Sequence, residues 1–216
     1  MTEKKTKRLK TPPKTPRMSK KAAAEAAYSQ AILRHSVGDK AGALAELEHS
    51  IQLNPKFGPA ILTMGSVEYQ RERRADGKKL LFSLLSLPRT TENLFSIIDD
   101  AGSFLLSANE FDDALELYRK AAKKFPKVAQ FQQRVGFCAA QEGSYDEALA
   151  SSRRAIELDP ENAAFAGDLG WTLVLAERYE EAEATFLRAL AMDPNNERVQ
   201  ANLQYCRERM SEKPWT

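Results

Sequence analysis

Apolar residues recur along most of this chain at the spacing of helices that bury one face. From about Ala22 onward, alanine, leucine and aromatic residues return every three or four positions, and short polar breaks interrupt them. Residues 1–19 lack this periodicity and contain three prolines, which prevent a regular helix. The pattern therefore predicts a disordered arm over residues 1–21, an all-α region over 22–212 and a short tail over 213–216.

The polar breaks recur in phase, which indicates an internal repeat. One template fits four segments: a turn residue, an alanine five positions later, another small residue seven later, and a proline five after that. The closing residues Pro126, Pro160 and Pro194 are 34 positions apart. The four segments read GDKAGALAELEHSIQLNP, NEFDDALELYRKAAKKFP, GSYDEALASSRRAIELDP and ERYEEAEATFLRALAMDP.

A glycine also repeats, in the helix that precedes each of the later segments. Its positions are Gly65, Gly102, Gly136 and Gly170. Glycine within a helix costs about 0.5–1 kcal/mol relative to alanine, so its repetition predicts a close approach of two backbones there. At a helix start, Ser144 followed by Glu147 predicts a capping box.

These features resemble the tetratricopeptide repeat family, whose unit of 34 residues folds as helix–turn–helix. The resemblance implies a right-handed superhelical solenoid of about five units and a capping helix. The second unit departs from the pattern because Gly77 occupies the alanine position and three extra residues follow it. The predicted units cover residues 24–57, 58–94, 95–128, 129–162 and 163–196, and the cap covers 197–212.

Charge divides the chain into two parts. Residues 1–21 hold nine basic residues and one acidic residue, a net charge of +8, whereas the remainder carries −6. No apolar run approaches the roughly 20 residues that span a membrane, and no apolar signal segment begins the chain. We therefore expect no membrane insertion and a cytoplasmic location, or a nuclear one in a eukaryotic source.

The sequence offers no recognisable chemistry of its own. His35 and His49 are the only histidines, they are 14 residues apart, and no cysteine lies near them. Cys138 and Cys206 occupy the same repeat position and are expected to be buried thiols. Phosphate-loop, dinucleotide-binding and nucleophile-elbow motifs are absent. We expect no enzymatic activity, no catalytic residue, no metal and no cofactor.

In the tetratricopeptide repeat family, the first helix of each unit lines a concave groove that binds peptides or partner helices. The ninth position of three successive first helices is aromatic here: Phe137, Trp171 and Tyr205. Aromatic residues at helical spacing often form core, so packing is the competing interpretation of this stripe. The expected peptide-binding residues are Tyr69, Asp99, Asp100, Gln133, Arg134, Phe137, Asp168, Trp171, Asn202 and Tyr205.

Two functions follow from these expectations. The first is a non-catalytic scaffold or adaptor that binds a peptide or helical segment of another protein in the groove. The alternative is binding of nucleic acid or an anionic surface through the basic arm, whose cations could contact phosphates but are not interleaved with aromatic residues. The oligomeric state is left open, because the first helix could stack on a second copy.

Overall fold

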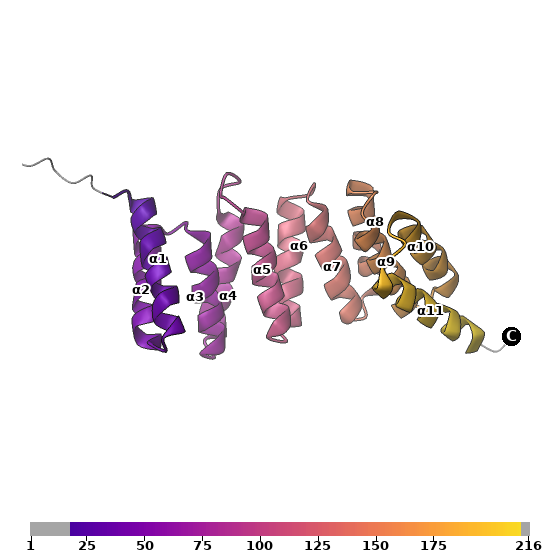
Figure 1. Ribbon diagram of the computed structural model, residues 1–216, viewed down its shortest axis with the longest axis horizontal. Coiled ribbons are helices and arrows are strands. Elements are labelled where there is room, and N and C mark those ends of the chain that lie inside the picture. The colour runs from indigo at the N-terminus through magenta and orange to yellow at the C-terminus, as the bar shows by residue number, and fades with distance from the viewer. Residues whose placement is uncertain (1–17, 213–216) are drawn as a thin grey trace, which may run out of the picture. The chain divides into compact units, whose positions relative to one another are not determined.

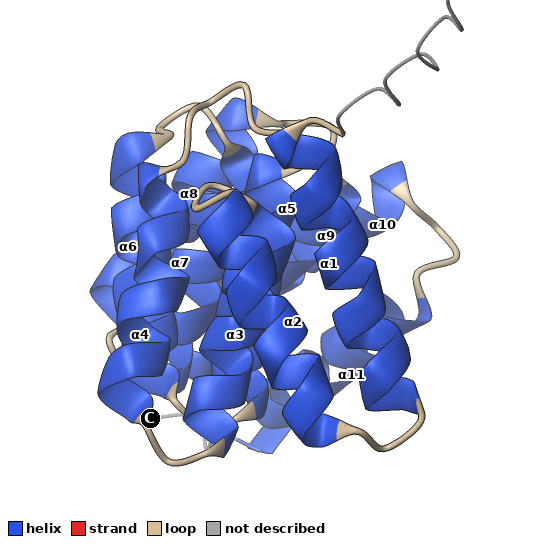
Figure 2. Cartoon of the chain, turned by 90° about the vertical axis from the view of Figure 1, so that its left-hand side faces the viewer, coloured by secondary structure: helices blue, strands red, loops and turns tan. Residues whose placement is uncertain are grey.

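The computed structural model describes residues 18–212, and all regular structure within that range is helical (Figures 1 and 2). The disorder predicted for residues 1–17 and the tail at 213–216 lie outside the described residues. Helix α1 begins at Lys20, behind the N-cap Ser19, so helix starts within the segment assigned to the arm. The chain divides into two compact units, Met1–Ala60 and Ile61–Thr216.

The first unit is built on one helix pair, α1 (Lys20–Ser36) and α2 (Lys40–Leu53). Small side chains fill the interface, because Ala24, Ala27 and Ala31 of α1 are all buried. The hydroxyl of Ser50 on α2 donates to the carbonyl oxygen of Ala24 at 2.8 Å. Small residues let the two backbones approach, and this bond satisfies a polar group that the approach buries.

The second unit consists of helix pairs and a final single helix, which confirms the predicted all-α repeat solenoid with a terminal helix. In each pair, the odd-numbered helix is the first helix and the even-numbered helix is the second. The elements are α3 (Gly58–Gln70, which begins in the first unit), α4 (Arg74–Ser83), the 3₁₀ helix η1 (Leu84–Ser86), α5 (Leu94–Ser107), α6 (Phe111–Lys124), α7 (Ala129–Gln141), α8 (Tyr145–Leu158), α9 (Ala163–Leu175), α10 (Tyr179–Met192) and α11 (Glu197–Glu212).

The turn within each pair places one residue in the left-handed region. Gly143 has φ +76°, and Asn109 and Glu177, one repeat to either side, have φ 60° and 57°. Glycine adopts this conformation without strain, whereas the other two positions accept a side chain there. The capping box predicted beside this turn is wrong, because the Ser144 side chain makes no cap bond and Glu147 binds Arg119 of α6 instead.

The repeated glycine is in close contact with the second helix of its pair. At Gly65 and Gly136 the nearest atoms include main-chain atoms of that helix, as predicted, whereas at Gly102 and Gly170 they belong to an aromatic side chain. A Cβ atom added at any of these glycines would lie closer than 3.0 Å to a residue sixteen positions later on the second helix. Real Cβ contacts are essentially never that short, so a larger residue at any of these positions requires the facing side chain to shift. The facing residues are Leu81 for Gly65, Tyr118 for Gly102, Ser152 for Gly136 and Phe186 for Gly170.

Candidate peptide-binding site

The predicted aromatic stripe lies on three successive first helices and remains accessible. Phe137 on α7 and Tyr205 on α11 are 41% and 44% exposed, and Trp171 on α9 is half-buried. The rings of Trp171 and Tyr205 are in contact, with centroids 5.8 Å apart. The stripe is therefore not enclosed core, although Trp171 also packs against the core beneath it.

A hollow of about 230 Å³ opens beside this stripe. One repeat position at this hollow has a smaller side chain than elsewhere. The position that holds Tyr118 in α6 and Phe186 in α10 holds Ser152 in α8, and Ser152 is part of the wall. The lining residues are Phe137, Ala140, Gln141, Ser152, Asp168, Trp171, Thr172, Arg198 and Asn202.

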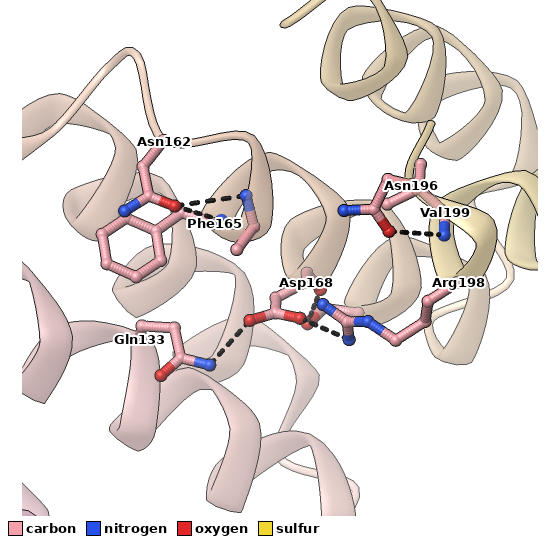
Figure 3. A network of polar contacts seen from close by, with 9 residues as sticks. Gln133, Asn162, Phe165, Asp168, Asn196, Arg198 and Val199 are labelled. Atoms are coloured by element: carbon pink, nitrogen blue, oxygen red, sulfur yellow. Dashed lines mark hydrogen bonds and ion pairs between the residues drawn. The ribbon is translucent and has the colours of Figure 1, made fainter. Parts of the chain in front are cut away.

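The charged groups at the hollow neutralise each other. Gln133 Nε2 donates to Asp168 Oδ2 at 2.7 Å, and Arg198 Nη1 donates to Asp168 Oδ1 at 2.9 Å (Figure 3). The Arg198 side chain is 58% exposed, which weakens this pair through solvent screening. The pair nevertheless links α9 to α11 and leaves the hollow without a net charge of its own.

Two asparagines set where the helices around the hollow begin. Asn162 Oδ1 accepts from the backbone N–H of Phe165 at the start of α9, and Asn196 Oδ1 accepts from Val199 at the start of α11 (Figure 3). The two caps are one repeat apart in the sequence. Each satisfies an N–H group that the helix itself leaves without a partner. They therefore help to fix the positions of the side chains on α9 and α11.

Three predicted site residues are used for packing instead. The Arg134 guanidinium donates two hydrogen bonds, of 2.6 and 2.8 Å, to the Asp99 carboxylate. The Tyr118 hydroxyl donates to the same carboxylate at 3.1 Å. Burial is the main cause that raises the pKa of Tyr118, and Asp99 adds to it. Tyr69 is buried, and its hydroxyl donates to Asp113 at 2.7 Å. These side chains hold repeats together rather than line the hollow.

The remaining predicted residues fall into two groups. Phe137, Asp168, Trp171 and Asn202 line the hollow, while Gln133 and Tyr205 touch members of that lining. Asp100 is exposed on α5 and does not belong to the lining. Sequence reasoning missed five of the lining residues, although the change to serine in the glycine-facing column was a readable signal. The missed residues are Ala140, Gln141, Ser152, Thr172 and Arg198.

Within residues 18–212, no cluster of histidine, cysteine and carboxylate side chains is placed to hold a metal ion, and no helix is long and apolar enough to cross a membrane. Cys138 and Cys206 are both buried and unbridged. Burial raises the pKa of the Cys138 thiol to about 12, which keeps it protonated near neutral pH.

Comparison with known proteins agrees with this architecture. Residues 100–160 and 139–204 each match a sequence profile described as tetratricopeptide repeat. No curated protein matches the chain. The chain is a helical-repeat protein, and it belongs to the tetratricopeptide repeat family.

Solved structures of the same fold cover most of the chain. YrrB, described as a TPR protein with an unusual peptide-binding site, has TM-score 0.57 and 23% identity over 84% of this chain and 92% of that one. A thermophilic TPR protein of Thermus thermophilus has TM-score 0.51 and 18% identity over 86% and 100%. MamA of Desulfovibrio magneticus has TM-score 0.56 and 16% identity over 81% and 97%. At these identities the likeness shows the fold alone.

Proposed function

We propose that this protein is a non-catalytic, cytoplasmic scaffold or adaptor that binds a peptide or helical segment of another protein across α7, α9 and α11. The observation that carries the proposal is the hollow beside accessible aromatic rings on three consecutive first helices. Aromatic residues that remain accessible in the free protein are typical of binding hot spots. An apolar cleft with a few polar groups around it is the usual form of a recognition site.

The lining also indicates how a segment would be held. Phe137 and Trp171 offer an apolar wall for one anchoring side chain. Gln141 and Asn202 carry carboxamides, which can both donate to and accept from a peptide main chain. Because Asp168 and Arg198 already pair with each other, the hollow offers no unpaired charge to a charged anchor. The proposed ligand therefore enters with an uncharged side chain.

Selection of ligands from a random peptide library on the full-length protein tests the proposal. Peptides selected on the wild type should bind Trp171→Ala at least tenfold more weakly, because truncating a central aromatic residue costs about 2 kcal/mol or more in affinity. Phe111→Ala is a matched control, since Phe111 is 39% exposed on the second helix α6. Equal binding by all three proteins, measured by calorimetry, would remove the hollow from the binding site.

The alternative, nucleic-acid binding, depends on the charge of residues 1–21. It predicts salt-sensitive binding of an oligonucleotide that is lost when the basic residues of 1–17 become glutamine and is unaffected by Trp171→Ala. The two functions are therefore separable in one set of variants.

A further inference from the structure

A cluster of basic side chains lies where α6 meets the connection between α4 and α5. Residues 84–93 and 119–128 together hold six basic residues and one acidic residue, Glu92. The connections that follow α4 and α6 lie at the same end of the helices (Figure 1). Two of the basic residues are neutralised, because Arg119 pairs with Glu147 and Lys120 with Glu116. The other four basic residues of this cluster form no ion pair with a carboxylate among the described residues: Arg89, Lys123, Lys124 and Lys127.

Two of these four cations are held in place by main-chain carbonyl groups. Lys124 Nζ donates to the carbonyl oxygen of Leu85, and Arg89 Nη2 donates to the carbonyl oxygen of Lys124 at 3.1 Å. Both cations also lie over the ring of Phe125, at 5.2 Å for Arg89 and 5.7 Å for Lys124. A carbonyl or a ring orients a cation without cancelling its charge. The two charges are therefore positioned in advance and remain available to an anion.

The repeat architecture does not require this charge. Cations at the end of a helix can stabilise its dipole, and Lys123 and Lys124 stand in the last turn of α6. However, α8 and α10 end at the same point of the repeat with no basic residue in their last turns. One repeat after Lys123 and Lys127 the chain carries Glu157 and Glu161. The basic cluster thus belongs to this junction, beside the irregular second repeat.

We propose that Arg89, Lys123, Lys124 and Lys127 form a second binding site, distinct from the hollow, for a short acidic segment of a partner protein. Phe95 lies at its edge, 38% exposed and 5.1 Å from the Phe125 ring, and offers contact for an apolar residue within that segment. Residues 61–212 contain 19 basic and 25 acidic residues. A long polyanion that extends past the cluster meets this acidic surface, whereas a short acidic peptide does not.

A labelled octaglutamate peptide tests the site by fluorescence anisotropy. The protein is the full-length chain in which the seven basic residues of 1–17 are glutamine, so that the arm does not bind the probe. Lys123→Gln/Lys127→Gln should weaken binding at least threefold, and adding Arg89→Gln should weaken it further, more strongly at low salt. Lys123 and Lys127 are exposed and form no side-chain hydrogen bond or ion pair among the described residues, so the double variant should fold normally.

Lys40→Gln/Arg188→Gln is the matched control, because it removes the same charge from two exposed positions elsewhere. Equal loss in both double variants, or no binding by the parent chain, would overturn the proposal. Tighter binding of a thymidine oligonucleotide than of the peptide, lost in Lys123→Gln/Lys127→Gln, would show that the occupant is nucleic acid. Trp171→Ala should leave octaglutamate binding unchanged, so that failure of the hollow and failure of this site are told apart.

Discussion

The α5–α6 and α7–α8 pairs start from the same close contact and differ in what fills the space next to it. At the first, Gly102 faces Tyr118, which is fully buried and bonded to Asp99. At the second, Gly136 faces Ser152, which lines the hollow. In both places the glycine is in close contact with the second helix. One junction uses the adjoining space for packing, and the other leaves it open on the face where the aromatic stripe lies.

The comparison shows that a repeat can acquire a site by losing volume at one position. Leu81 and Phe186 occupy the same column in α4 and α10 and are fully buried. Ser152 is therefore the small member of a column that is otherwise filled. Its loss of volume needs no insertion and no change in the 34-residue spacing. Substitutions at the two junctions test whether they differ in this way.

The largest effect is expected at the filled junction. Tyr118→Ala should lower the free energy of unfolding by about 3–5 kcal/mol, because it opens a cavity and leaves Asp99 with one partner fewer. Denaturant titration measures the loss. Tyr118→Phe keeps the ring and should lose only the hydrogen bonds, about 1 kcal/mol. A loss below 1 kcal/mol for Tyr118→Ala would show that the two junctions are equally loose.

A smaller difference is expected between the two glycines. A methyl group at Gly102 would press on the buried Tyr118 ring, so Gly102→Ala should cost about 1–3 kcal/mol through overpacking. At Gly136 the nearest atom is the Ser152 hydroxyl, which can turn into the hollow, although main-chain atoms follow at 3.1 and 3.2 Å. The gain in helix propensity, up to about 1 kcal/mol, should leave Gly136→Ala nearly neutral. Equal losses in thermal unfolding would contradict this contrast.

Much of the fold could be predicted because each feature of the repeat recurs several times along the sequence. The glycine column and the closing prolines set the helix pairs, and the structure agrees for the regular repeats. The second repeat was harder, because Gly77 and the inserted residues break the pattern. There the α-helix ends at Ser83, and η1 buries Leu84 and Leu85. Such an end depends on the packing of η1 against α5 and α6, which the local sequence does not encode.

The candidate site was only partly predictable. A position in the repeat determines which way a side chain points, but not which residue it binds. Asp99 and Arg134 stand at positions that face the groove, yet each satisfies the other through a bond between neighbouring repeats. Tyr69 similarly turns its hydroxyl to Asp113. A buried charge is costly without a partner, so these pairs form wherever the geometry allows. Phe137 has no such partner and stays exposed, as its position predicted.

The smallest effect on stability should accompany a clear effect on binding. Ser152→Leu places in α8 a side chain of the kind that Gly65 already accepts from Leu81. Burial of the new side chain contributes about 1.5–3 kcal/mol, and tight fitting costs about 1–3 kcal/mol, so the free energy of unfolding should change by less than about 1 kcal/mol. The leucine would occupy the hollow, and peptides selected on the wild type should bind at least tenfold more weakly in calorimetry. Ser151→Leu, one residue away and outside the lining, is the control and should keep its affinity. If Ser152→Leu binds those peptides as tightly as the wild type, the ligand does not enter the hollow and must lie along the exposed rings alone.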